Sequence, residues 1–456
     1  MKHYDLIVVG GGSGNSVFGH EHATWKNAIV EEDRLGGTCL NRGCIPSKIF
    51  VLTADHARVI RDAGRWDLTA TYGGVDWPAL RDRVFARIDP AHESGVRYRE
   101  QQGVDVYSSR ARFVAPKVLE VQGQQITARH VVIAIGTRPM VPEIPGLAEV
   151  SHHTSDSVMR LDALPRSLVI IGGGFIAVEM GHVFSALGTV VTILQRGPRL
   201  LMAEDHDISD GFTRQFSTHT RVETGVSVTA ARRSDPHDIE AGAVVTYVRD
   251  GVEREVAAET ILVATGRVSN ADRIDAVAGG LRLDERDRIV VDEHFRTGVD
   301  GVWAFGDVAN DFQLKHMANA EARVVRHNIS HPDDLRTLGH DRAPHAVFSD
   351  PQVAAYGLTE RAARATGRTV LVARRFYSDT AYGWALEDTS GFIKVIADAD
   401  DRTILGAHAM GPHAAILLQP LVQAMTFGQT VDQLAHDVIY IHPALSELVE
   451  QVLLEL

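Results

Sequence analysis

The sequence has little cysteine, no long apolar run and a deficit of positive charge. Two of the 456 residues are cysteines, too few for the disulfide framework of a secreted domain. No apolar stretch reaches the ~20 residues that span a bilayer, and the opening MKHYDLIVVG carries no cleavable signal pattern. The formal net charge of −13 argues against nucleic acid or an anionic membrane as a main partner. We therefore expect a cytoplasmic protein, and no metal site is predicted.

The rest of the composition is ordinary for a globular protein. Hydrophobic residues make up 45% of the chain and charged residues 23%. A chain of 456 residues is too long for one hydrophobic core, so about three domains are expected.

Both cysteines, Cys39 and Cys44, lie in the segment GGTCLNRGCIPSK at residues 36–48. A disulfide that closes so short a loop stabilises little, which disfavours a structural role. On a regular helix, residues five apart are ~8–9 Å apart at Cα, beyond the ~7 Å that a disulfide allows. Gly43 is where the backbone could depart from the helix. The spacing leaves two interpretations: a strained, exchangeable dithiol, or two unrelated buried thiols.

The first 31 residues have the pattern of a dinucleotide-binding βαβ unit. A predicted strand at Tyr4–Val9 leads into GGGSGN at residues 10–15, then a predicted helix, then a second strand at Asn27–Val30 that ends at Glu31. Glycines let main-chain N–H groups approach a pyrophosphate, and an acid about 20 residues later can hold a ribose.

The same pattern returns in the middle of the chain. A strand at Ser167–Ile171 precedes the glycines of residues 172–179, a helix through Ala186 and a strand at Val190–Leu194. Two such units predict two dinucleotide-binding domains. The similar segments VVIAIGTRP (131–139) and ILVATGRVSN (261–270) suggest a duplication or a matching strand that closes each domain.

From about residue 341 the pattern changes to strands and short helices. Strands are predicted at 392–396 and 404–408, and helices at 414–426 and in the tail. Five apolar residues share one face of the predicted tail helix: Leu445, Leu448, Val449, Val452 and Leu453. A third domain of this kind often carries a subunit interface.

Taken together, these motifs resemble the class I flavoprotein disulfide reductases, the family that includes glutathione reductase and dihydrolipoyl dehydrogenase. GGTCLNRGCIPSK resembles the redox-active box, AFGDV (304–308) the second FAD motif, and HPALSE (442–447) the C-terminal acid–base motif. The resemblance implies an α/β fold with two Rossmann-like dinucleotide-binding domains and a C-terminal α+β dimerisation domain. The implied FAD domain covers 1–150 and 266–335, the NADPH domain 151–265, and the dimerisation domain 336–456.

Within the family, the chain is most similar to the mycothione reductases. The segments that carry this similarity are GGGSGNS at the start, RIDP (87–90), HTSDSVMRL (153–161), HVFSALG (182–188), ATGRVSNAD (264–272) and AYGWALEDTSG (381–391). The similarity implies mycothione, the disulfide of mycothiol, as substrate.

The resemblance also implies a path for electrons: from NADPH to FAD, then to a Cys39–Cys44 disulfide, then to the substrate. Cys39 would be the thiol that attacks the substrate, and Cys44 the one that faces the flavin. His442 would be the general acid–base and Glu447 would orient its ring. In the family this histidine reaches the disulfide of the neighbouring subunit, so a homodimer is expected.

Further cofactor residues follow from the same resemblance. Lys48, paired with Glu179, would lie beneath the flavin. The implied FAD contacts are Gly10, Gly12, Gly14, Glu31, Gly37, Thr38, Lys48, Gly136 and Asp307. The implied NADPH contacts are Gly172, Gly174, Ala177, Glu179, Gln195, Arg196, Arg199 and Gly266.

The residues after the strand at 190–194 bear on the choice between NADH and NADPH. An NAD site has an acid there for the ribose 2′-hydroxyl, but the strand ends Leu194-Gln195-Arg196, with Arg199 following. Two guanidiniums can bind a 2′-phosphate, which favours NADPH. Glutathione reductases usually have their second arginine where Met202 lies, so Arg199 would have to substitute for it.

Three other functions remain open on the sequence. Dihydrolipoyl dehydrogenase, which uses NAD, is disfavoured by the missing acid near residue 195, and glutathione reductase is a further alternative. A flavin- and nucleotide-binding redox sensor is the non-enzymatic alternative, although Cys39, Cys44, His442 and Glu447 form a set that a sensor does not need. Mercuric reductase would require a second, C-terminal cysteine pair, which the sequence lacks.

Overall fold

The computed structural model describes residues 1–235, 237–238, 242–339 and 343–456. The chain divides into two compact units. Unit 1 contains Met1–Ser47, Ala79–Met140 and Gly266–His340, and unit 2 contains Lys48–Pro78, Val141–Thr265 and Asp341–Leu456. Within the described residues, no helix combines the length and the apolar character that crossing a membrane requires.

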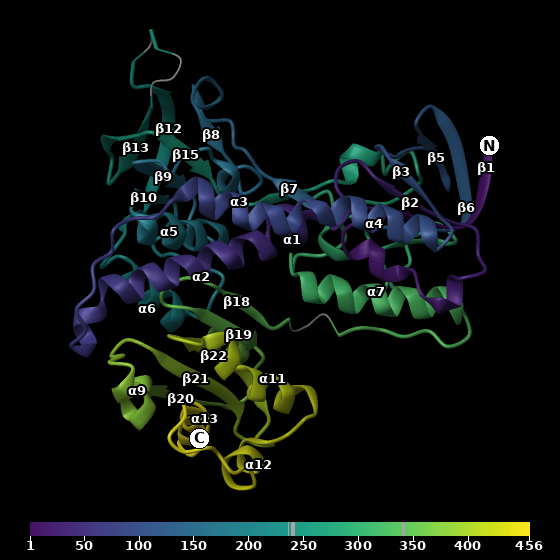
Figure 1. Cartoon of the computed structure of the whole chain (residues 1–456). Helices are drawn as coiled ribbons and strands as arrows, with labels where there is room; N and C mark the ends of the chain where they lie inside the picture. The colour runs from purple at the N-terminus through teal and green to yellow at the C-terminus, as the bar shows by residue number, and fades with distance from the viewer. Residues whose placement is uncertain (236, 239–241, 340–342) are drawn as a thin grey trace. The chain divides into compact units, whose positions relative to one another are not determined.

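Unit 1 is built on a parallel sheet in the order β3-β2-β1-β6-β17 (Figure 1). Its strands are β1 (Lys2–Val9), β2 (Asn27–Glu31), β3 (Val104–Ser108), β6 (Gln124–Ile133) and β17 (Val302–Ala304). The hairpin of β4 (Arg112–Ala115) and β5 (Val118–Val121) pairs antiparallel with the first part of β6. Residues Leu6–Val9 of β1 are all buried, as expected for a central parallel strand. The two strands predicted at the start of the chain are confirmed, with bounds longer by one or two residues.

The helices of unit 1 include α1 (Gly37–Arg42), α4 (Pro90–Gln101), α7 (Lys315–Ser330) and most of α3 (Trp77–Ile88). A small two-stranded sheet joins β7 (Thr137–Pro139) to β16 (Arg267–Ser269). Short 3₁₀ segments are η1 (Ser13–Val17), η2 (His20–His22), η6 (Ala271–Ile274) and η7 (Gly306–Val308).

The prediction of a regular helix after the first glycine loop is wrong. The structure has η1 and η2 there, separated by Phe18 and Gly19. Serine, asparagine and glycine are weak helix formers, and their side chains compete for backbone hydrogen bonds. Asn15 does this directly, because its side-chain amide donates to the carbonyl oxygen of Gly11.

Unit 2 contains a second parallel sheet, in the order β11-β10-β9-β15-β8. Its strands are β8 (His152–His153), β9 (Ser167–Ile171), β10 (Val190–Gln195), β11 (Arg221–Thr224) and β15 (Thr260–Val263). The helices α5 (Phe175–Leu187) and α6 (His206–Phe216) belong to this part, and α2 (Cys44–Arg61) lies in unit 2 from Lys48 onward. An antiparallel sheet is formed by β12 (Val226–Arg233), β13 (Ala243–Arg249) and β14 (Val252–Ala258). Both parallel sheets have a glycine loop after their central strand, so the predicted α/β fold class is confirmed.

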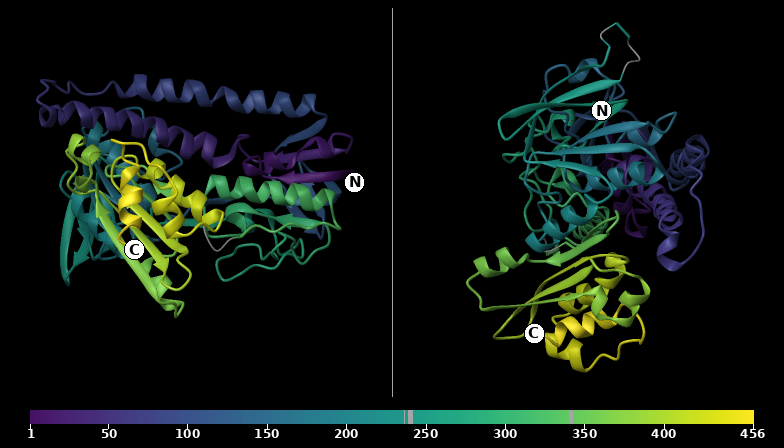
Figure 2. Two further views of the ribbon diagram at one scale, coloured as in Figure 1. Left: turned by 90° about the horizontal axis from the view of Figure 1, so that it is seen from below. Right: turned by 90° about the vertical axis from the view of Figure 1, so that its left-hand side faces the viewer.

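The C-terminal part of unit 2 is an antiparallel sheet with short helices packed on it (Figure 2). The sheet order is β18-β19-β22-β21-β20, from β18 (His345–Val347), β19 (Val353–Gly357), β20 (Val370–Phe376), β21 (Phe392–Asp398) and β22 (Ile404–Met410). The helices are α8 (Glu360–Ala365), α9 (Ala381–Ala385), α10 (Ala414–Leu417), α11 (Gln419–Thr426), α12 (Val431–His436) and α13 (Glu447–Leu453). Shorter 3₁₀ segments of unit 2 are η3 (Ala63–Trp66), η4 (Leu147–Glu149), η5 (Val158–Arg160) and η8 (Tyr377–Asp379).

Two predicted helices of this region differ in detail from the structure. The helix predicted at 414–426 divides at Leu418 into α10 and α11, and Pro420 lies in the first turn of α11, where proline is tolerated. The tail helix α13 begins only at Glu447. All five residues of the predicted apolar face are buried, but Leu445 precedes the helix and only the other four lie in α13.

Candidate functional site

The two cysteines lie on either side of a break between helices. Helix α1 ends at Arg42, Gly43 leaves the helical conformation with φ −130° and ψ −121°, and α2 begins at Cys44. A Cβ on Gly43 would lie 3.0 Å from the carbonyl oxygen of Thr38 and 3.3 Å from the Cα of Cys39. The expected departure from the helix at Gly43 is confirmed, and it allows Cys44 to approach Cys39.

In the structure both cysteines are free thiols that share a hydrogen bond. The bond from the Cys44 thiol lowers the pKa of Cys39 to about 7, and the positive charge of Lys315 lowers it further against the effect of burial. The same bond raises the pKa of Cys44. Cys39 therefore carries the thiolate of the pair near neutral pH, which suits a nucleophile.

The first glycine loop has no room for side chains at several positions. Gly10 has φ +106°, and a Cβ there would lie 2.3 Å from the carbonyl oxygen of Ala134. Gly37 has φ +62°, and its Cβ would lie 2.7 Å from the Cα of Gly12. A Cβ on Gly14 would lie 2.8 Å from a side chain of β1. The backbones approach one another as a pyrophosphate-binding loop requires.

Glu31 ends strand β2 beside this loop. Its Oε2 accepts a hydrogen bond of 2.6 Å from the main-chain nitrogen of Gly11. Burial raises the pKa of this carboxyl group, whereas the bond from Gly11 lowers it. Thr38 lies next to Gly37 in the first turn of α1. The structure thus brings both predicted residues to the glycine loop.

Asp307 follows strand β17 and is hydrogen-bonded to Thr137, the first residue of β7. The Thr137 hydroxyl donates to Asp307 Oδ2 at 3.1 Å, and Arg267 Nε donates to the Thr137 hydroxyl oxygen at 2.8 Å. Burial raises the pKa of Asp307, and the charge of Arg267 opposes this rise. Gly136, with φ +61°, directly precedes Thr137. Thr137 therefore links Gly136, which precedes it in sequence, to Asp307, which accepts its hydrogen bond.

The second glycine loop joins β9 to α5 in unit 2. Gly172 has φ +124°, and a Cβ there would lie 2.2 Å from the carbonyl oxygen of Ala264. Gly174 precedes the first turn of α5, and Ala177 in that helix is fully buried. Gly266, with φ +125°, follows strand β15. This loop leads into a regular helix of 13 residues, in contrast to the first.

The arginines after β10 have different surroundings. Arg196 is exposed, whereas Arg199 is half-buried and its Nε lies 3.3 Å from Asp210 on α6. The side-chain amide of Gln195 donates to the carbonyl oxygen of Arg199 at 3.0 Å. The structure therefore places the predicted pair on one loop, but a carboxylate already contacts Arg199.

Lys48 and Glu179 meet at a third residue, Phe348. The main-chain nitrogen of Phe348 donates to Glu179 Oε1 at 2.9 Å, and Lys48 Nζ lies 3.8 Å from the centroid of the Phe348 ring. Burial lowers the pKa of Lys48, and the charges of Asp55 and Glu179 act in the opposite direction. The lysine and the glutamate interact electrostatically around one aromatic ring.

His442 and Glu447 form a hydrogen-bonded pair in the C-terminal part of unit 2. The distance from His442 Nδ1 to Glu447 Oε1 is 2.7 Å. The histidine side chain is 71% exposed, whereas that of Glu447 is 15% exposed. Glu447 also accepts a bond from the main-chain nitrogen of Ala444 at 3.3 Å, which fixes the carboxylate. Since the carboxylate accepts from Nδ1–H, Nε2 is left for exchange of a proton with another group.

Comparison with known protein families now decides the identity of the fold. Residues 4–322 match the pyridine nucleotide-disulphide oxidoreductase model, and residues 343–453 match the dimerisation domain of the same family. The chain belongs to the pyridine nucleotide-disulphide oxidoreductases. The predicted C-terminal dimerisation domain is confirmed by the second match.

Three relatives show how this oxidoreductase compares with named enzymes. Mycothione reductase of Mycobacterium tuberculosis (strain ATCC 25618 / H37Rv) is 44% identical over 100% of both chains. Dihydrolipoyl dehydrogenase of the same strain is 32% identical, over 99% of this chain and 97% of its own. Mercuric reductase of Staphylococcus aureus is 29% identical, over 94% of this chain and 78% of its own.

This oxidoreductase is an FAD-containing enzyme that reduces a disulfide with NADPH. The observed residues fit the two cofactors. In unit 1 a side chain at Gly10 or Gly37 would fill the space where two backbones meet, and a carboxylate lies at the end of the next strand. In unit 2 the corresponding strand ends with Gln195 instead, and Arg196 follows it, which suits a 2′-phosphate.

Three residues of this oxidoreductase were missed by the sequence analysis. Lys315 lowers the pKa of Cys39, and Phe348 contacts both Lys48 and Glu179. Glu321 on α7 is fully buried and accepts a bond of 2.7 Å from the main-chain nitrogen of Gly306, beside Asp307. Only Glu321 had a sequence signal, as an acid on the face of α7 that otherwise buries apolar residues.

Proposed function

We propose that this enzyme reduces mycothione to mycothiol with NADPH, as a homodimer in the cytoplasm. One observation carries the choice of substrate: the M. tuberculosis mycothione reductase is 44% identical over the full length of both chains. The identity to dihydrolipoyl dehydrogenase over nearly the same length is 32%.

Cys39 is proposed as the thiolate that attacks the substrate disulfide. Its sulfur forms a mixed disulfide with one half of the substrate, and the other half leaves as a thiolate that takes up a proton. The Cys44 thiol then loses its proton and attacks the Cys39 sulfur. This step releases the second thiol and leaves a Cys39–Cys44 disulfide, which two electrons from NADPH reduce again. The lowered pKa of Cys39 supports the order of attack.

His442 is proposed as the group that gives the leaving thiolate its proton. Its Nδ1 is held at 2.7 Å by Glu447, so Nε2 is the nitrogen available to the substrate. The carboxylate of Glu447 holds the ring in one orientation through Nδ1.

Homodimer formation is supported by exposed apolar side chains in the dimerisation domain. Ile416, Phe427, Ile439 and Ile441 are each more than 70% exposed in the single chain. Large apolar groups this exposed are typical of a surface that another subunit covers. Two of them are within three residues of His442, so we propose that His442 serves the Cys39–Cys44 pair of the partner subunit.

The cofactor contacts are proposed at the residues that the two glycine loops bring together. When bound, FAD supplies the transfer of an electron pair between the nicotinamide and the sulfur pair. Gly10, Gly12, Gly14, Gly37 and Thr38 would contact its pyrophosphate region, Glu31 a ribose, and Gly136 with Asp307 the remaining chain, with Lys48 beside the ring. The proposed NADPH contacts are Gly172, Gly174, Ala177, Glu179, Gln195, Arg196, Arg199 and Gly266.

We also propose the three-domain division at residues 150/151, 265/266 and 335/336. The break between the family matches, from residue 322 to residue 343, is compatible with the last boundary.

The purified yellow enzyme tests the substrate directly. NADPH or NADH is mixed with mycothione, glutathione disulfide or lipoamide, and cofactor oxidation is followed by absorbance at several concentrations. The proposal expects the highest kcat/KM for mycothione with NADPH. A preference for lipoamide with NADH would contradict it and favour dihydrolipoyl dehydrogenase.

The variant Cys39→Ser separates enzyme from redox sensor. It is expected to keep FAD and its reduction by NADPH, but to lose mycothione turnover by about a hundredfold or more, because no attacking thiolate remains. Retained turnover would contradict the role of Cys39. A wild-type enzyme that is reduced by NADPH but turns over no disulfide would favour the sensor.

A further inference from the structure

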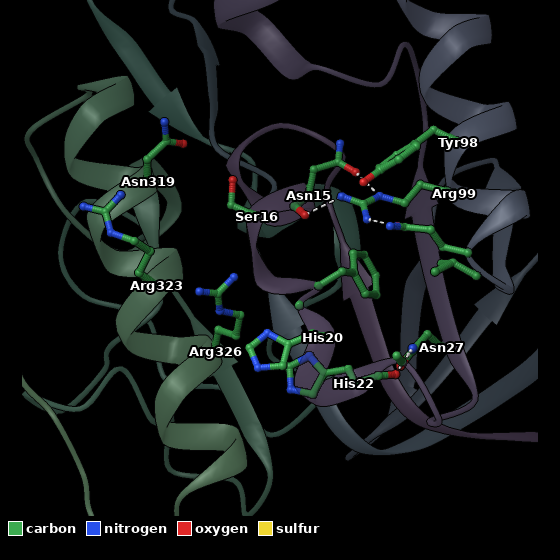
Figure 3. A pocket seen from close by; sticks show the side chains of 15 residues that line it. Asn15, Ser16, His20, His22, Asn27, Tyr98, Arg99, Asn319, Arg323 and Arg326 are labelled. Atoms are coloured by element: carbon green, nitrogen blue, oxygen red, sulfur yellow. Dashed lines mark hydrogen bonds between the residues drawn. The ribbon is translucent and has the colours of Figure 1, made fainter.

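A cavity of about 750 Å³ lies in unit 1, and none of the described residues that line it is among those proposed to contact a cofactor. Its walls come from η1 and η2, from the end of α4 and from the middle of α7 (Figure 3). Asn15 and Ser16 of η1 and His20 and His22 of η2 form one wall of it, in the part of the chain where the sequence predicts a helix.

The charge of this cavity is opposite to that of the chain. Arg99, Arg323 and Arg326 line it, and none of the 15 described lining residues is an aspartate or a glutamate. The chain as a whole has a formal net charge of −13. A concave surface that is lined by positive charges raises the local concentration of anions.

Arg99 is a fixed part of the wall. Its Nη2 donates to the carbonyl oxygen of Asn15 at 2.6 Å, its Nε to the Asn15 side chain at 3.0 Å, and its Nη1 to Gln102 at 2.6 Å. The guanidinium also lies over the ring of Phe18, 4.8 Å from the centroid. Burial lowers the pKa of Arg99, but a guanidinium stays charged at any physiological pH.

Arg323 and Arg326 are less constrained and come from one face of α7. Residues three apart on a helix are neighbours, so both guanidiniums can reach the same ligand. Arg323 is exposed. Arg326 packs against Gly19, where a Cβ would lie 2.8 Å from its Cδ, and its Nε lies 3.8 Å from Glu21. This single carboxylate neutralises at most one of the three arginines.

We propose that this cavity binds a small phosphate-bearing anion through Arg323 and Arg326, with Arg99 as a fixed positive wall. The planar guanidinium of an arginine can donate two parallel hydrogen bonds to phosphate oxygens. Arg323 and Arg326 provide two such groups on one face of α7. Asn15, the last residue of the first glycine loop, and Ser16, which follows it, border the ligand. The site is separate from the disulfide chemistry and does not depend on the identity of the thiol substrate.

Isothermal titration of the holoenzyme with sodium pyrophosphate tests the proposal. Saturating NADP⁺ is present so that the nucleotide site in unit 2 is occupied. We expect saturable binding of about one pyrophosphate per chain, and binding about tenfold weaker in Arg323→Gln and in Arg326→Gln, because each loses a charge-assisted hydrogen bond. Arg97→Gln, on α4 but outside the cavity, is the matched control and should bind as the wild type does.

The FAD spectrum and the melting temperature establish that each variant is folded. Arg323 is exposed, so its variant tests the site even if Arg326→Gln fails to fold. Glycerol 3-phosphate in a second titration distinguishes an organic phosphate from an inorganic one as ligand, and binding of either with the expected variant pattern supports the site. Absence of saturable binding of both probes, or equal weakening by Arg97→Gln, would overturn the proposal.

Discussion

The Cys44 thiol donates its proton toward the Cys39 sulfur, so the two chemically identical residues have different roles before any substrate arrives. The hydrogen bond has the larger effect on the pKa of Cys39, and the charge of Lys315 adds to it. Lys315 is held by a bond of 3.0 Å to the Ser13 hydroxyl, which keeps the positive charge in place. The reactivity of Cys39 is thus set by two neighbours, Cys44 five residues away in sequence and Lys315 276 residues away.

The pH dependence of thiol reactivity follows from this arrangement. With the pKa of Cys39 at about 7, the rate of alkylation of the reduced enzyme by iodoacetamide should rise with pH, have its midpoint near pH 7, and level off only well above that midpoint. Cys44→Ala removes the hydrogen bond, and Lys315→Gln removes the positive charge, so each should move the midpoint to higher pH, Cys44→Ala by more. Lys315→Arg keeps the charge and serves as control. A wild-type midpoint near 9, the ordinary value for a thiol, would contradict the prediction.

At the scale of elements, the two glycine loops are followed by different structures, although both are proposed to bind a nucleotide. The loop of unit 2 leads into α5, as the sequence pattern predicts. The loop of unit 1 is followed by η1 and η2, and its close contact is with α1 instead, through Gly12 and Gly37. The helix that begins at Gly37 also carries Cys39, so the same turn positions the first nucleotide loop and the attacking thiol.

Replacing Gly37 tests that contact. Gly37→Ala would place a Cβ 2.7 Å from the Cα of Gly12, and backbone atoms cannot move aside without opening the loop. We expect about a tenfold or greater loss of FAD affinity, measured by release of flavin on dilution. Gly103→Ala is the control, because Gly103 has a similar φ of +73° but open space around it. Equal FAD retention in both variants would show that the close contact between Gly37 and Gly12 is not needed to bind FAD.

The surroundings of the two arginines after β10 predict that they contribute unequally to NADPH binding. Arg196 is exposed, whereas Arg199 lies 3.3 Å from Asp210, which already balances its charge. Arg196→Gln should therefore raise the KM for NADPH by about tenfold, and Arg199→Gln by less, with little change in the KM for NADH. Steady-state kinetics with both nucleotides measure this. A parallel rise for NADPH and NADH would show that neither arginine reads the 2′-phosphate.

At the scale of the whole molecule, the acid–base pair and the thiol pair belong to different units of the chain. His442 and Glu447 lie in the dimerisation domain, next to exposed Ile439 and Ile441. A closed twofold dimer would bury such a surface and would contain two equivalent active sites. The proposed function therefore depends on assembly as well as on fold.

Hybrid dimers test this dependence. Cys39→Ser and His442→Ala chains, each nearly inactive alone, are unfolded together and refolded with FAD. If His442 acts on the partner's thiols, a hybrid dimer has one intact site, and a random mixture should recover about a quarter of wild-type turnover. Refolded single variants are the control. Turnover no higher than theirs would show that each chain completes its own site.

The sequence by itself determined the chemical inventory and the class of fold. The strand at Ser167–Ile171 was predicted with its observed bounds, and four of the five residues predicted for the apolar face of the tail helix lie on that helix and are buried, because both predictions depend on short-range periodicity. The redox box, both glycine loops and the HPALSE segment are contiguous, so their residues could be found without knowing what surrounds them.

Only the tertiary structure decided which side chains modify these groups. Lys315 acts on Cys39 and Phe348 contacts both Lys48 and Glu179, although these residues are far apart in sequence. The 3₁₀ path after Gly10–Asn15 depends on a balance between weak local helix preference and competing hydrogen bonds, which no periodicity reveals. Charge and hydrogen bonding act through space, so the protonation of the thiols and the cationic cavity exist only once the chain has folded.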